Sequence, residues 1–91
     1  MKRNYNLVYL RINPENYDLR TIFTAEYGTH RIAAIQAAKD ASRYEVKKIT
    51  PQGLPYDLAG VECVAETEET TYQPLYLDTY FNGVRFGRIN Y

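Results

Sequence analysis

The side chains that could act as nucleophile or base in this sequence are few. It holds one cysteine, Cys63, and one histidine, His30, so these two form the only conceivable thiol–imidazole pair. Cys63 falls in the middle of an expected strand, where a free cysteine packs as a small hydrophobe. His30 falls at the expected start of a helix, where the helix dipole disfavours the protonated imidazole. Catalysis by such a pair requires hydrogen-bond contact, for which the sequence gives no indication.

Motifs of the common enzyme classes are also absent. There is no GxxxxGK[ST] phosphate loop, no GxGxxG, no HExxH, no CxxC and no GxSxG. We therefore expect a protein that is not an enzyme and needs no cofactor. A small enzyme of unfamiliar chemistry stays open as a third reading, which substitution of His30 and Cys63 would test.

A run of carboxylates near the end of an expected strand is the one candidate for a metal site. It consists of Glu62, Glu66, Glu68 and Glu69. Hard cations favour clustered carboxylates, but this spacing follows no known cation-binding loop. A solvated charge run explains the same residues more simply, so we expect no metal.

Four basic residues could contact phosphate groups: Lys39, Arg43, Lys47 and Lys48. Asp40 and Glu45 interrupt them, which favours an ordinary solvated surface. The net charge of the chain is zero, but residues 1–48 carry +4 and residues 49–91 carry −4. Nucleic-acid binding by this patch, with tyrosines stacking on bases, is the alternative function.

The first half of the chain predicts a hairpin followed by a helix. Tyr5–Ile12 is apolar on both alternating faces and predicts an inner strand, whereas Leu19–Ala25 alternates. The alanine-rich segment from His30 to about Arg43 predicts a helix, with Thr29 as its N-cap. An alanine face lets the helix approach a sheet closely.

Four further strands are expected after the helix. The first two are Tyr44–Thr50 and Val61–Thr67, with Val61, Cys63 and Ala65 facing one way. The last two form a hairpin, Leu75–Phe81 and Val84–Tyr91, around Asn82-Gly83, which favours a type I′ turn.

A two-residue turn fixes the register of that last hairpin. Phe81 should face Val84, Thr79 should face Phe86, Tyr80 should lie opposite Arg85, and Tyr76 opposite Ile89. These first two pairs should then face the core, on the same side as Leu75 and Leu77. The predicted partner-binding residues project from the other face: Tyr76, Tyr80, Arg85, Ile89 and Tyr91. Tyrosine, arginine and isoleucine suit an interface. If the sheet is covered on both faces, however, they are ordinary core.

These elements predict a single α+β domain over residues 1–91. Its expected order is ββαββββ, an antiparallel sheet of five to six strands with a single helix packed on one face and a C-terminal β-hairpin. One helix cannot cover both faces of such a sheet, so one face is expected to stay largely open.

The function expected from these features is that of a non-catalytic protein-binding module. Another protein would be bound through the open sheet face or by edge-strand pairing. Such a domain fits a small phage or mobile-element accessory protein that inhibits a host protein by covering its surface. Self-association through the open face is compatible with this. A lone cysteine and the lack of any apolar run long enough for a membrane span lead us to expect a cytoplasmic location and no membrane partner.

Overall fold

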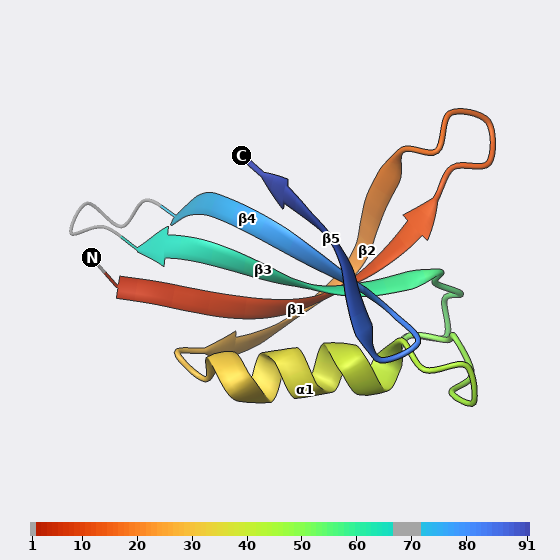
Figure 1. The fold of residues 1–91 in the computed structure, drawn as a ribbon, viewed down its shortest axis with the longest axis horizontal. Helices are drawn as coiled ribbons and strands as arrows, with labels where there is room; N and C mark the ends of the chain where they lie inside the picture. Colours follow the sequence, from red (N-terminus) through yellow and green to blue (C-terminus); the bar gives the residue numbers. More distant parts are fainter. Residues whose placement is uncertain (1, 67–71) are drawn as a thin grey trace.

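The computed structural model describes residues 2–66 and 72–91 and confirms the α+β class. Its elements are β1 (Lys2–Ile12), β2 (Leu19–Gly28), α1 (Arg31–Ala41), β3 (Leu58–Glu66), β4 (Tyr72–Phe81) and β5 (Val84–Asn90). Neighbouring strands are all antiparallel, in the spatial order β2-β1-β3-β4-β5. The helix lies along one face of the sheet (Figure 1). No helix in the described part of the chain is long and apolar enough to cross a membrane.

Strand β1 lies inside the sheet between β2 and β3, as its two apolar faces predict. Its odd-numbered residues, among them Tyr5 and Leu7, face the helix. Its even-numbered residues, among them Val8 and Leu10, form a smaller apolar cluster on the opposite, open face. The predicted hairpin of β1 and β2 is confirmed, with two irregularities in its register.

Helix α1 packs on β1 and β3 through alanine. Ala34 and Ala38 are fully buried, and they lie against a core formed by Tyr5, Leu7, Ala59, Val61, Cys63 and Tyr80. Because alanine ends at Cβ, the helix backbone comes close to the sheet. The helix is shorter than predicted: its N-cap is His30 rather than Thr29, and it ends at Ala41.

The predicted strand Tyr44–Thr50 is not a strand. This segment forms turns, with one isolated bridge between Ile49 and Pro55, so the chain order is ββαβββ rather than ββαββββ. The reason lies in hydrogen bonds that its local sequence does not reveal. Backbone N–H of Tyr44 donates to Asn82, and the Lys48 ammonium donates to backbone carbonyls of the segment itself. The chain is thereby held at the end of the sheet instead of joining it.

The C-terminal hairpin has the predicted turn but a different register. Asn82 and Gly83 have φ of 48° and 80°, as a type I′ turn requires. Phe81 pairs with Val84 and Tyr80 with Arg85, as predicted. Phe86 then forms a bulge, because Thr79 pairs with Gly87. Beyond the bulge, Ile89 lies opposite Leu77, and Tyr76 lies opposite Asn90, which corrects the expected register.

Candidate functional site

The five predicted partner-binding residues lie on both faces of the sheet. Tyr76, Tyr80 and Arg85 are on the helix side, because Tyr76 pairs with Cys63 and Tyr80 with Arg85. Tyr80 is 3% exposed and belongs to the core. Ile89 and Tyr91 are exposed on the open face. The bulge at Phe86 separates the two groups, since it reverses the side on which the later residues of β5 project.

On the helix side, the ring of Tyr76 contacts an arginine, Arg88, that was not among the predicted site residues. The guanidinium of Arg88 lies 4.0 Å from the centre of that ring. Arg88 also donates two hydrogen bonds, of 2.6 and 3.0 Å, to the buried carboxylate of Asp78. These bonds raise the pKa of Arg88. Arg85 is more distant, 3.9 Å from Asp78. This contact is internal and leaves little of Tyr76 for a partner.

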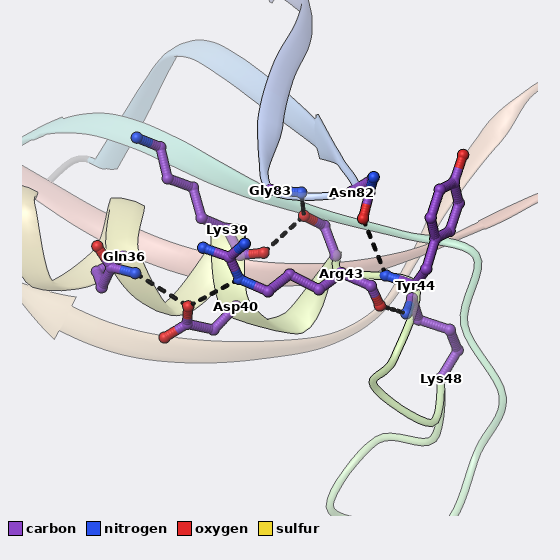
Figure 2. A network of polar contacts seen from close by, with 9 residues as sticks. Gln36, Lys39, Asp40, Arg43, Tyr44, Lys48, Asn82 and Gly83 are labelled. Carbon is purple, nitrogen blue, oxygen red and sulfur yellow. Dashed lines mark hydrogen bonds and ion pairs between the residues drawn. The ribbon is translucent and has the colours of Figure 1, made fainter.

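The predicted phosphate-binding residues are partly occupied by internal contacts. Arg43 forms an ion pair of 3.4 Å with Asp40 and lies against Gly83. The Lys48 ammonium donates to the carbonyl oxygen of Arg43 (Figure 2) and to that of Val46. Lys39 is half-buried on α1, and Lys47 is exposed. The structure therefore brings these residues near one another, but it does not present four free cations.

A cluster of exposed aromatic rings lies at the β4–β5 turn, which corrects the prediction that Phe81, Val84 and Phe86 face the core. The rings of Tyr44 and Phe81 meet edge to face with centroids 5.4 Å apart, and those of Phe81 and Phe86 are 6.4 Å apart. Their exposed fractions are 69%, 46% and 63% for Tyr44, Phe81 and Phe86. Val84 pairs with Phe81 and is exposed as well. We call these four residues the aromatic cluster.

Backbone hydrogen bonds hold the aromatic cluster in place. The N–H of Asn82 donates to the carbonyl oxygen of Ser42 at 2.7 Å, and the N–H of Gly83 donates to its hydroxyl at 2.8 Å. The side-chain oxygen of Asn82 accepts from the N–H of Tyr44 at 3.1 Å (Figure 2). The end of α1 is thus joined to the hairpin turn, and Tyr44 is carried against Phe81. Sequence reasoning missed the cluster because Tyr44 lies about 40 residues before the other three members and is brought to them by these bonds.

The open face of the sheet carries two hollows. The β1–β2 turn and the C-terminal end of β5 both lie on the side of the sheet opposite α1 (Figure 1). Between them lies a groove of about 540 Å³ lined by Leu10, Tyr17, Asp18, Leu19, Thr21, Leu77, Ile89 and Tyr91. A second, more polar hollow on the same face includes Asn4, Asn6, Glu26, Glu62 and Glu66. The face thus has an apolar end and an acidic end.

Charge is divided between the two faces of the sheet. By strand register, the side chains of one aspartate and five arginines project on the helix side: Asp78, Arg3, Arg11, Arg20, Arg85 and Arg88. The open face carries three glutamates and one lysine: Glu26, Glu62, Glu66 and Lys2. In the strands, positive charge therefore gathers on the helix side and negative charge on the open face, and each face draws its charged residues from both halves of the sequence.

His30 and Cys63 lie in very different surroundings. His30 is exposed at the start of α1, and Cys63 is fully buried in the core beneath the helix. Within residues 2–66 and 72–91, no three His, Cys, Asp or Glu side chains are arranged to hold a metal ion. Glu68 and Glu69 lie outside the described residues.

Comparisons with protein-family models, with curated proteins and with solved structures gave no significant match to this chain.

Proposed function

We propose that this chain is a non-catalytic protein-binding module and that the aromatic cluster is its principal contact surface. The observation that carries the proposal is that the rings of Tyr44 and Phe86 both pack against Phe81 and yet all three remain between 46% and 69% exposed. A contiguous apolar patch of large side chains on a protein surface marks an interaction site.

The chemistry of the aromatic cluster fits a protein partner. Aromatic side chains provide a large contact area. Because they have only two rotatable bonds, they lose little conformational entropy on binding. The hydrogen bonds through Ser42 and Asn82 have already fixed the backbone, so little further ordering is needed. Arg85, between Val84 and Phe86, supplies the polar rim of an interface. The module would act by covering the surface of a partner that presents an apolar hollow.

The test compares affinity capture by the wild-type protein with capture by Tyr44→Ala/Phe86→Ala. Both side chains are exposed, so the double variant should keep its fold by circular dichroism. We expect the double variant to capture less of the partner. Its binding free energy should be weaker by about 2 kcal/mol or more, which is the range of interface hot spots. The matched control is Ile32→Ala/Leu54→Ala, which removes two equally exposed apolar side chains elsewhere.

Equal capture by the cluster variant and the control variant would contradict the proposal. Sedimentation of the wild-type protein alone belongs to the same experiment. A homodimer that dissociates in the cluster variant would show that the partner is a second copy of the chain.

Nucleic-acid binding is the second candidate, and the charge of the helix side favours it. The arginines of the strands project there, on the same side as α1 with its Arg31 and Lys39. Phosphate contacts release counterions, so affinity for a labelled single-stranded oligonucleotide would fall steeply between low and moderate salt. Arg11→Gln/Arg20→Gln would then weaken binding, and Lys47→Gln would test the basic patch read from the sequence. Weak binding that does not depend on salt would argue against this function.

A further inference from the structure

One row of side chains crosses the whole open face of the sheet. The pairing of neighbouring strands aligns Glu26 with Asn6, Asn6 with Glu62, Glu62 with Leu77, and Leu77 with Ile89. The row therefore runs from β2 to β5, and it changes from acidic to apolar between β3 and β4. The next row contains Gly60 and Gly87, which pair on either side of Thr79, and the side chains of Leu77 and Val8 lie over Gly60.

The two carboxylates in this row, Glu26 and Glu62, form no ion pair within the described residues. Glu66 lies outside the row and differs from them, because it receives a hydrogen bond of 2.8 Å from Asn4 and lies 3.8 Å from the Lys2 ammonium. Glu62 receives only a long hydrogen bond of 3.5 Å, from the amide of Asn6. The face attracts positive charge beside an apolar groove.

We infer that the open face binds a cationic amphipathic segment of a partner protein. Its apolar side chains would enter the groove over Leu77 and Ile89, and its lysine or arginine side chains would reach Glu62 and Glu26. A charge-complementary face of this kind selects partners and speeds their encounter. A second copy packed open face to open face is the wrong occupant, because it would place the same acidic groups against one another. This site is separate from the aromatic cluster and does not depend on it.

The probe is a random twelve-residue peptide library displayed on phage and selected against the intact protein. We expect the enriched peptides to be net positive and to carry at least two large apolar residues. Synthetic copies should bind more weakly as salt rises. Glu26→Gln/Glu62→Gln should weaken their binding by about tenfold.

Three further variants locate the site and distinguish it from the aromatic cluster. Ile89→Thr should weaken binding of the peptides, because it removes apolar surface from the groove. Threonine is also β-branched, so the substitution should preserve the strand. Glu45→Gln is the charge control, since Glu45 lies in the connection after α1. Phe86→Ala should leave peptide binding unchanged even if it abolishes capture of the partner bound by the aromatic cluster.

Several results would overturn the inference. These are failure to enrich any peptide, enrichment of neutral or acidic peptides, and binding that the Glu26→Gln/Glu62→Gln variant leaves intact. A homodimer that Ile89→Thr dissociates would also overturn it, because the face would then hold a second copy.

Discussion

Tyr56 connects the long irregular segment after α1 to the helix itself. Its hydroxyl donates a hydrogen bond of 2.8 Å to the carbonyl oxygen of Ala41, the last residue of α1. Carbonyl groups in the last turn of a helix have no partner within the helix. The ring of Tyr56 is buried and meets Tyr9 edge to face, with centroids 4.7 Å apart. The Tyr56 side chain thus provides a hydrogen-bond donor for the end of α1, and its ring adds to the core.

Removal of that hydroxyl should destabilise the fold. We expect Tyr56→Phe to lower the free energy of unfolding by about 1 kcal/mol, because a buried carbonyl loses its donor while the ring is retained. The measurement is the urea midpoint. Tyr44→Phe is the control, since Tyr44 is 69% exposed, and its effect should be within about 0.5 kcal/mol. Equal effects of the two substitutions would show that the Tyr56 hydrogen bond does not stabilise the protein.

At the scale of the strands, Gly60 marks the closest approach between β3 and its neighbour β4. A Cβ atom at this position would lie 2.6 Å from the backbone oxygen of Asp78 and 3.0 Å from the side chain of Leu77. A backbone oxygen inside a sheet cannot move without shifting the strand. Gly87, also on the open face, is different, because its Cβ would meet only the Thr79 hydroxyl, at 3.3 Å.

Substitution by alanine should therefore destabilise the protein more at Gly60 than at Gly87. Gly60→Ala should destabilise the protein by about 1–3 kcal/mol, the usual cost of overpacking, because β4 must move away from β3. Gly87→Ala should cost less than about 1 kcal/mol, since a hydroxyl can turn aside. Denaturant midpoints of the two variants provide the comparison. A larger loss in Gly87→Ala would contradict the strand packing described above.

In the molecule as a whole, several tyrosines are part of the core rather than of the exposed surface. Burial is the main cause that raises the pKa of Tyr5, Tyr9, Tyr56 and Tyr80 above its ordinary value of 10.0. These phenol groups come from β1, from β4 and from the segment after α1, and their burial favours the neutral form.

The direction of these shifts predicts alkaline destabilisation. The folded protein holds the phenolic protons more tightly than the unfolded chain, whose tyrosines titrate near 10. The stabilising effect of this difference is fully present below about pH 10 and is lost as the pH rises toward the folded-state pKa values. We expect the urea midpoint to be unaffected by tyrosine ionisation up to about pH 9 and to fall by about pH 11. A midpoint unchanged between these values would contradict the burial of these hydroxyl groups.

The sequence by itself determined the features that depend on near neighbours. Asn82-Gly83 specified the turn because both residues tolerate positive φ. The alanines of residues 33–41 specified a helix that packs closely, and the alternation around Cys63 correctly placed that residue in the core. The first hairpin followed from its two apolar strands and the polar turn between them. Each of these signals is read within a few residues of the chain.

Only the tertiary structure decided which surfaces those elements expose. The bulge at Phe86 moved Ile89 and Tyr91 to the face opposite Tyr80 and Arg85, since one extra residue reverses the direction of every later side chain. The hydrogen bonds between Ser42 and the distant hairpin turn kept residues 44–50 out of the sheet and brought Tyr44 to Phe81. Strand pairing aligned Glu62 with Leu77 and formed the acidic and apolar row. These contacts join residues far apart in the sequence, so no local pattern could reveal them.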